Sequence, residues 1–340
     1  MLSEAQGWGV DGRAILKTSD GGATWINVTP PNFPADFAFQ GGAFLSAKTA
    51  WVPYGWICAK GYCQSASGVG GVLRTTDGGK TWKATAIGSP NGQPVITSSI
   101  DFINPDDGWL MAGHGGAAGS EAVDVYRTTD GGATWSRVSG ASFTSNAPAG
   151  SLPVGGDKNG IVFADARTGW VTGDAPANGV ADVYRTTDGG LTWHHQTLPS
   201  PAGEDLSKAE LGVSLPQFFT SRDGVMIVNA SQTIIYSTSD GGASWHPAVV
   251  VRHRSLANVQ FVSPNVAWAF DPNMRVWVRT LDGGTTWGDV ALPPAAAGGE
   301  LDLVNPKVVF VWQGGGGGAF WRTTDGGHSW SRIAMALSSA

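Results

Sequence analysis

The stretch YRTTDGGATW, residues 126–135, combines an acid, two glycines, threonine hydroxyls and a tryptophan. It could be a ligand-binding loop, or a turn that the fold uses many times. The pattern T-x-D-G-G-x-[TS]-W occurs seven times in the 340 residues, with 42 to 58 residues between successive acids. The acids are Asp20, Asp77, Asp130, Asp188, Asp240, Asp282 and Asp325. The sequence is therefore built on a repeat of about 42 residues, with insertions in the first four intervals.

A second series of residues has the same period. Four units place a phenylalanine seven residues before a tryptophan, and the other units keep this spacing with weaker residues. The pairs are Phe44–Trp51, Phe102–Trp109, Phe163–Trp170, Phe261–Trp268, Phe218–Val225, Leu303–Phe310 and Met1–Trp8. Each unit reads as four short strands separated by turn residues. The sequence predicts an all-β fold, a single domain over residues 1–340 that forms a seven-bladed β-propeller of four-stranded antiparallel blades. The repeated stretches are predicted to be the turns between the third and fourth strands.

The seven acids of this stretch are predicted to be structural. An aspartate can accept hydrogen bonds from turn amides, the hydroxyls can satisfy others, and the paired glycines permit positive φ. The tryptophan is expected to bury its ring between adjacent sheets. A catalytic group is needed once, whereas this one occurs seven times around a ring.

We call the two residues of each of these pairs marks. The first blade lacks sequence for its innermost strand, because the chain starts at Met1, the first mark of the first pair. Ten residues follow the last box tryptophan, Trp330. We expect the C-terminal segment 332–340 to supply that innermost strand and close the ring, since closure removes exposed strand edges.

Composition argues against several classes of function. A formal net charge of -6 disfavours nucleic acid and anionic membranes as partners, and no run approaches eighteen apolar residues. The start MLSEAQGWGV lacks the features of a signal peptide and reads like the start of an excised domain. Cys58 and Cys63 could close a small disulfide, which would favour an exported protein, or could be free thiols. We expect an extracytoplasmic, monomeric domain without a metal or cofactor.

The copies of YRTTDGGATW resemble Asp-box (BNR) repeats. The coupling of DDGWLMAG or RTGWVTG to RTTDGG resembles the Ycf48-like and HCF136-like propellers. The resemblance covers nearly the whole chain. It implies seven blades and, in photosynthetic members, a non-enzymatic role in photosystem II assembly. Asp boxes also occur in sialidases, xyloglucan-cleaving glycosidases and sortilin-type receptors, so the boxes alone do not select a function.

The insertions are predicted to gather on the face opposite the boxes, where functional residues concentrate on loops. The candidate binding residues there are the aromatic Phe33, Phe37, Tyr54, Trp56 and Tyr62 and the basic Arg252, His253 and Arg254. The aromatic residues suit sugar rings or apolar side chains, or simply pack under their own loops. The basic residues could receive a carboxylate, or could be solvated without a partner.

Acidic residues on the same loops are the candidates for an enzyme. They are Asp36, Glu121, Asp157, Asp174, Glu204, Asp205, Glu210 and Asp271. A glycosidase needs two of them about 5–10 Å apart. The charged stretch GEDLSKAEL, residues 203–211, could form a helical lid or be a soluble decoration. The leading hypothesis is a binding or assembly scaffold that engages a protein or glycan through the long-loop face. The alternative is a glycoside hydrolase or lyase that uses loop carboxylates on that face.

Overall fold

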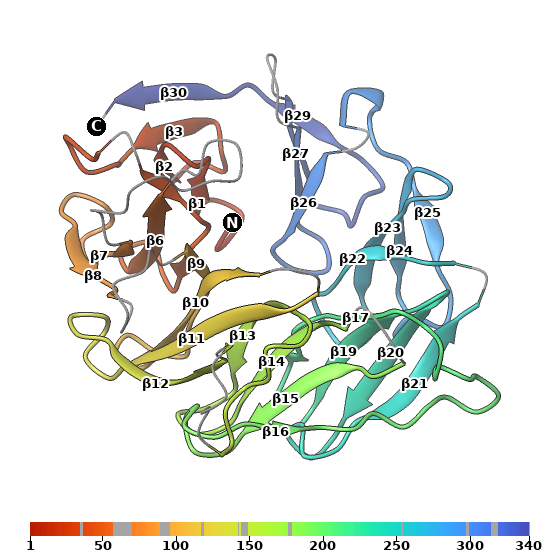
Figure 1. Cartoon of the computed structure of the whole chain (residues 1–340). Helices are drawn as coiled ribbons and strands as arrows, with labels where there is room; N and C mark the ends of the chain where they lie inside the picture. The colour runs from red at the N-terminus through yellow and green to blue at the C-terminus, as the bar shows by residue number, and fades with distance from the viewer. Residues whose placement is uncertain are drawn as a thin grey trace.

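The computed structural model of the chain is an all-β propeller, a ring of sheets that confirms this level of the prediction (Figure 1). It describes residues 1–34, 37–56, 70–88, 96–116, 119–141, 143, 149–175, 179–252, 254–296, 299–313 and 319–339. Within these ranges the helical structure is one 3-10 turn, η2 (Pro294–Ala296), and no helix is long and apolar enough to cross a membrane. Residues 203–211 form turns and the start of a short strand, so the helical alternative for this stretch is wrong.

The described strands form six sheets, and we number the repeat units one to seven by the order of their boxes. The first sheet contains β1 (Gly7–Val10), β2 (Ile15–Thr18), β3 (Thr24–Asn27) and β30 (Ala336–Ser339). The second contains β4 (Phe37–Phe39), β5 (Ala43–Phe44), β6 (Ala50–Trp56), β7 (Gly71–Thr75) and β8 (Lys83–Ala86). The third contains β9 (Ile96–Phe102), β10 (Gly108–Gly116), β11 (Glu121–Thr128) and β12 (Ser136–Ala141).

A nine-stranded sheet spans the fourth and fifth units. It contains β13 (Asp157–Phe163), β14 (Gly169–Ala175), β15 (Asp182–Thr186), β16 (His194–His195), β17 (Leu211–Val213), β18 (Gln217–Phe218), β19 (Gly224–Asn229), β20 (Thr233–Thr238) and β21 (His246–Val251). The sixth unit forms β22 (Ala257–Phe261), β23 (Ala267–Asp271), β24 (Val276–Thr280) and β25 (Gly288–Val290). The seventh forms β26 (Glu300–Leu303), β27 (Val309–Gln313), β28 (Ala319–Thr323) and β29 (Ser331–Ile333).

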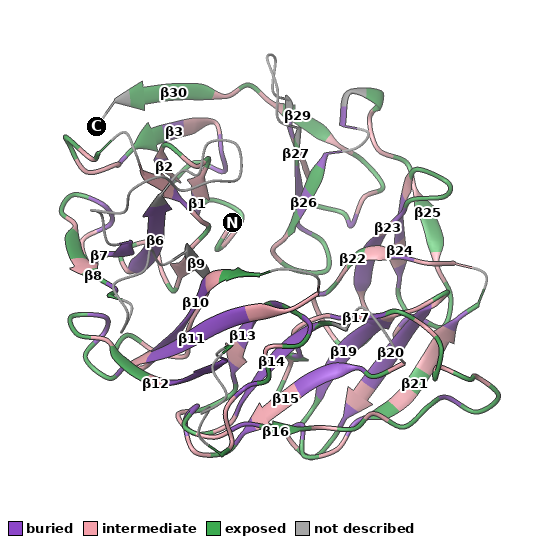
Figure 2. Cartoon of the chain, viewed as in Figure 1, coloured by how far each residue is buried: buried purple, intermediate pink, exposed green. Residues whose placement is uncertain are grey.

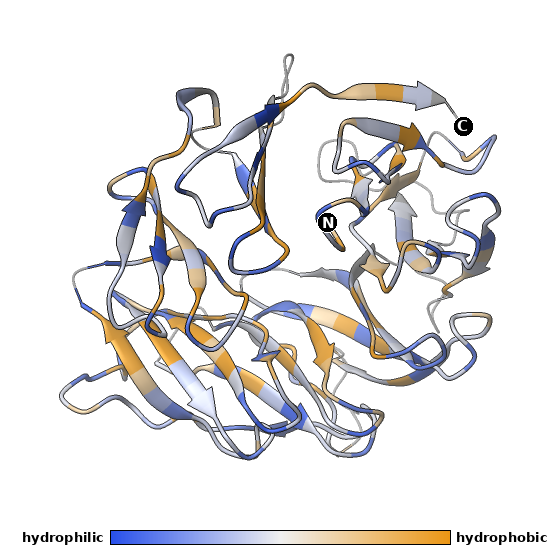
Figure 3. Cartoon of the chain, turned by 180° about the vertical axis from the view of Figure 1, so that it is seen from behind, coloured by the Kyte–Doolittle hydropathy of each residue, from blue (hydrophilic) through white to orange (hydrophobic). Residues whose placement is uncertain are grey.

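The phenylalanine and tryptophan marks meet between neighbouring sheets. Phe102 stacks on Trp51 with ring centroids 3.6 Å apart, and Phe163 stacks on Trp109 at the same distance. The box tryptophan Trp135 approaches Phe102 edge-on at 5.8 Å. The mark phenylalanine therefore faces the preceding sheet, and the mark tryptophan faces the following sheet. Buried residues are concentrated on the middle strands of the sheets, such as β11 and β19, whereas outer strands such as β25 and β30 are largely exposed (Figure 2). Apolar residues are concentrated on the strands (Figure 3).

Hydrogen bonds inside each box form a compact turn. Asp130 Oδ1 accepts from the Thr128 hydroxyl at 2.8 Å and the Thr134 amide at 2.9 Å, and Oδ2 accepts from the Thr134 hydroxyl at 2.7 Å. The Thr134 hydroxyl and amide, followed by the Thr128 hydroxyl, lower the pKa of Asp130 to about 2. The bonds from the first threonine hydroxyl and the later amide recur in all seven boxes. Each acid therefore has structural partners inside its own turn.

The first and last units meet differently from the prediction. The C-terminal strand β30 does join the first sheet, but it runs parallel to β3 at the outer edge, from Thr24↔Ala336 to Asn27↔Ser339. The predicted place beside β1 is wrong. The reason is that β29 is the outermost strand of its sheet, so the chain leaves it at the periphery and reaches β3 after two residues. On the inner side, the Met1 side chain packs against the cluster around Phe310, and its amino group contacts Asp302.

Candidate functional site

The two ends of the ring carry different connections. The first glycine of each box donates its N–H to a carbonyl near the start of its own unit, as Gly131 does to Asp106 at 2.8 Å. The boxes therefore share one end with the turns between first and second strands. The other connections gather at the opposite end, because antiparallel strands reverse direction at each turn. We call this end the long-connection face. Its described parts include residues 28–34, 149–156, 179–181, 197–210 and 254–256.

The predicted aromatic residues on this face pack largely against one another. The Phe33 ring centroid lies 4.6 Å from that of Phe39 and 5.4 Å from that of Tyr54, and the Phe37 ring is also 5.4 Å from Tyr54. Tyr54 is 9% exposed, and burial raises the pKa of its hydroxyl. A cavity of about 400 Å³ lies beside them, with Pro30, Pro31 and Trp82 in its wall. The structure thus favours packing for much of this set.

Several predicted residues fall outside the described part of the chain. They are Asp36, Tyr62, His253, Cys58 and Cys63, together with the side chain of Trp56, whose backbone ends β6. Their predicted roles in binding, catalysis or a disulfide remain predictions.

The basic residues have acidic neighbours. Arg252, with a side chain that is 65% exposed, lies 3.4 Å from Glu204. Arg254 lies 3.6 Å from both Asp271 and Asp289. Arg254 therefore has two acidic partners within the protein, and Arg252 is the more accessible of the two cations.

Three of the candidate acids accept hydrogen bonds from backbone amides. Asp271 is 2% exposed and accepts from the amides of Asn273 and Met274, at 3.0 and 3.1 Å. Glu121 accepts from the Lys158 amide at 2.8 Å. Asp205 accepts from Ser207 at 3.0 Å, and this donor lowers its pKa. These contacts account for Asp271 and Asp205 as parts of local turns, and for Glu121 as a link between β11 and β13.

Asp157 and Asp174 are the two acids that the structure places directly opposite each other, on β13 and β14. Directly opposed residues of antiparallel strands have Cβ atoms about 4.5–5.5 Å apart. Both side chains are exposed, and Asp174 accepts from the side-chain amide of Asn159 at 2.9 Å. Neither acid lines the cavities of about 280, 400 and 410 Å³ that lie between units.

A buried polar cluster on the third sheet was missed by sequence reasoning. Asp124 is 4% exposed, lies 2.7 Å from His114 Nε2, and accepts from Arg137 Nε at 2.6 Å. Burial opposes ionisation of Asp124, but the hydrogen bonds with His114 and Arg137 outweigh it and lower its pKa. The three residues come from β10, β11 and β12, so strand pairing alone brings them together.

Lys158 is a second buried group that the sequence did not indicate. Its side chain is fully buried, and Nζ donates to the Gly156 carbonyl at 2.9 Å and to the Gly155 carbonyl. Nζ also lies 3.6 Å from Asp182 Oδ2, while burial lowers the pKa of the amine. Lys158 therefore anchors the long connection before β13.

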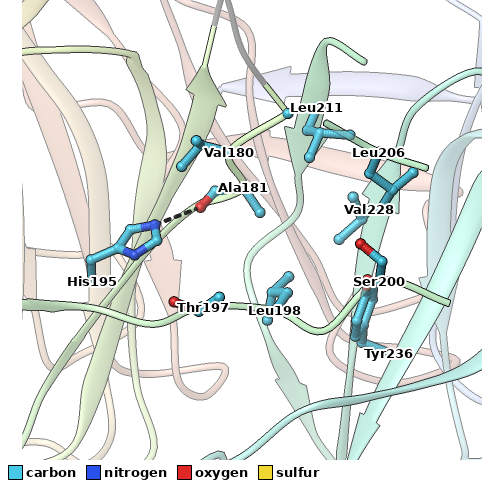
Figure 4. A pocket seen from close by; sticks show the side chains of 11 residues that line it. Val180, Ala181, His195, Thr197, Leu198, Ser200, Leu206, Leu211, Val228 and Tyr236 are labelled. Atoms are coloured by element: carbon cyan, nitrogen blue, oxygen red, sulfur yellow. Dashed lines mark hydrogen bonds between the residues drawn. The ribbon is translucent and has the colours of Figure 1, made fainter. Parts of the chain in front are cut away.

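An apolar pocket of about 280 Å³ lies between the fourth and fifth units. Figure 4 shows Leu198, Leu206 and Val228 around it, with Val180 and His195 at one side. His195 Nε2 lies 3.1 Å from the Ala181 carbonyl. The stretch predicted as a lid supplies Leu206, and Tyr236 fixes the adjacent connection by donating its hydroxyl to the Pro199 carbonyl at 2.8 Å.

Comparison with known proteins now identifies the family. The profile described as "Photosynthesis system II assembly factor YCF48" matches residues 59–339. The chain belongs to this family. The resemblance to Ycf48-like and HCF136-like propellers is thus confirmed.

Related sequences agree with this assignment, and solved structures share the fold. "Photosystem II assembly lipoprotein Ycf48" of Synechococcus sp. (strain CC9902) is 24% identical over 76% of this chain and 68% of that protein. HCF136 of Arabidopsis thaliana is 27% identical over 78% of this chain and 62% of that protein. A solved structure described as "YCF48 bound to D1 peptide" has a TM-score of 0.57 at 19% identity and covers 88% of this chain and 83% of that one. A xyloglucanase from Xanthomonas campestris has a TM-score of 0.59 at 16% identity and covers 95% of this chain and 50% of that one. At these identities the solved structures support the fold alone.

Proposed function

We propose that this member of the Ycf48 family is a non-enzymatic, extracytoplasmic assembly scaffold that binds an extended protein segment on the long-connection face. In this proposal the ring has seven four-stranded blades, and the nine-stranded sheet is two blades joined where β14 meets β17. Family membership supports the scaffold role, because relatives are named photosystem II assembly proteins and one similar structure is described as bound to a D1 peptide. A glycan is the alternative ligand of this face.

The apolar pocket between the fourth and fifth units carries the proposal. Its volume of about 280 Å³ lies just below the range for small-molecule sites, about 300–1,000 Å³, which suits one partner side chain better than a cofactor. Val180 beside it is 46% exposed, although it is aliphatic. Buried apolar anchors in such pockets provide much of the binding energy of protein interfaces.

A pair of matched substitutions tests this assignment. Val180→Asp places a charge beside the pocket, whereas Leu191→Asp places one on a box turn, where the leucine is 56% exposed. We expect Val180→Asp to weaken binding of a fluorescent D1 peptide at least about tenfold, measured by anisotropy, and Leu191→Asp to leave it unchanged. Arg252→Ala and Arg254→Ala, assayed in the same way, test the basic cluster. Equal affinities for Val180→Asp and Leu191→Asp would remove the pocket from the proposal.

A glycoside hydrolase is the second candidate function, and the opposed Asp157 and Asp174 favour it. A retaining glycosidase places its carboxyl groups about 5–5.5 Å apart. Both acids are exposed, so the scaffold is preferred. If the protein is a scaffold, we expect it to release no reducing ends from xyloglucan. Release that disappears in Asp157→Asn and Asp174→Asn would establish the enzyme instead.

A further inference from the structure

The sixth unit departs from the repeat at two facing positions. Three residues before the box threonine, five units carry valine or isoleucine, but the sixth carries Trp277. Two residues after its mark tryptophan the sixth unit carries Phe270, where none of the first five has an aromatic residue. Phe270 and Trp277 pair across β23 and β24 with ring centroids 5.5 Å apart. The seventh unit shares the change, but its Phe320 stacks in the core on Phe310.

A cavity of about 410 Å³ lies beside the Phe270 and Trp277 rings, between the sixth and seventh units. Its volume falls within the range of small-molecule sites, about 300–1,000 Å³. Trp277 is only 5% exposed, and its Nε1 has no acceptor among the described residues. Trp135, Trp245, Trp268, Trp321 and Trp330 also have an unpaired Nε1 among the described residues, so this donor alone does not mark the cavity as a site.

Planar polar side chains surround the cavity. Asn258, Gln260 and Glu300 are exposed, and none has a side-chain hydrogen bond with a described residue. The corresponding residue of the fifth unit, Gln217, accepts from the Phe261 amide of the next unit at 3.2 Å. Gln260 makes no such contact and instead lines the cavity.

The backbone at this edge is irregular. The β22–β23 register shifts between Ala257 and Gln260, and Asn258 has a φ of 52°. Bulges of this kind re-aim side chains and are frequent beside functional sites. Here the bulge lies within the strand that carries two of the three polar residues.

We propose that this cavity binds a neutral sugar unit, a function separate from the protein-segment pocket between units four and five. Sugar hydroxyls both donate and accept, so they match the side-chain amides of Asn258 and Gln260 and the Glu300 carboxylate. The apolar face of the sugar packs against the rings of Phe270 and Trp277. An apolar peptide side chain would leave those polar groups unpaired, which is unfavourable. No Lys or Arg lines the cavity, so it does not match a phosphate or carboxylate ligand.

Titration of the protein with cellotriose, xylotriose and maltotriose tests the proposal, with isothermal calorimetry as the readout. We expect at least one of them to bind saturably, with a dissociation constant of about 1 mM. Glu300→Ala removes a charged acceptor and Asn258→Gly removes an amide at a residue whose positive φ glycine tolerates. We expect Glu300→Ala to weaken binding at least about tenfold, and Asn258→Gly about threefold or more.

The matched control is Asp106→Ala, which removes an exposed acid from a turn at the box end of the ring. It should leave sugar binding unchanged, and circular dichroism should show all three variants folded. The proposal is overturned if none of the three trisaccharides binds, or if Glu300→Ala and Asn258→Gly bind as tightly as the unmodified protein. It is also overturned if these two substitutions abolish D1-peptide binding instead, because the cavity would then belong to the protein partner.

Discussion

The buried tryptophan that ends the seven-residue spacing in five units provides a sharp test of packing between units. Trp109 is fully buried, stacks on Phe163, and donates its Nε1–H to the Gly189 carbonyl at 2.9 Å. Trp268 occupies the same repeat position and is also fully buried, but its Nε1 has no acceptor among the described residues. There Arg279 donates to the equivalent carbonyl of the next box.

Replacing each tryptophan with phenylalanine isolates the hydrogen bond. Both substitutions remove similar volume, but Trp109→Phe also leaves the Gly189 carbonyl without its donor, a penalty of about 1–3 kcal/mol. Trp268→Phe deletes a donor that was already unpaired. We therefore expect Trp109→Phe to be about 2 kcal/mol more destabilising than Trp268→Phe. Trp109→Ala sets the scale for loss of the whole ring, about 3–5 kcal/mol.

Urea unfolding followed by far-UV circular dichroism measures this difference as a shift of the midpoint. Calorimetry should show a lower Tm for Trp109→Phe, by a few degrees relative to Trp268→Phe. If the two variants lose equal stability, the bond to the box carbonyl does not distinguish these interfaces and the reasoning is wrong.

Three further predictions concern the boxes and the buried lysine. The pKa of Asp130 is lowered from 3.8 to about 2, so its stabilising contribution is present above about pH 4 and is lost as the pH falls towards 2. The Tm should therefore fall between pH 5 and pH 2, and it should fall less steeply in Asp130→Asn. Gly242→Ala should destabilise far more than Gly12→Ala in thermal melts. Both have positive φ, but the new Cβ would lie 2.3 Å from Trp170 in the first case and meet nothing within 4 Å in the second. Lys158→Met should cost about 3 kcal/mol in urea unfolding, because Asp182 and two carbonyls lose their buried cation.

Local, repeated features were predictable from the sequence. The Asp boxes and the seven-residue spacing of residues such as Phe102 and Trp109 indicated the strands, the turns and the packing between sheets, because each depends on nearby residues. Contacts between distant segments were not predictable. The Asp124 cluster needs three strands in register, and β30 occupies the outer edge because of where β29 ends. The cavity beside Trp277 was overlooked, although this departure from the repeat was visible in the sequence.

Hydrogen–deuterium exchange with and without the D1 peptide tests whether a protein partner binds the long-connection face rather than the boxes. We expect slower exchange in residues 179–181 and 197–211, around the apolar pocket, with no change in the turn at Asp188 or the other boxes. Protection confined to the box turns, with residues 179–211 otherwise unaffected, would contradict it.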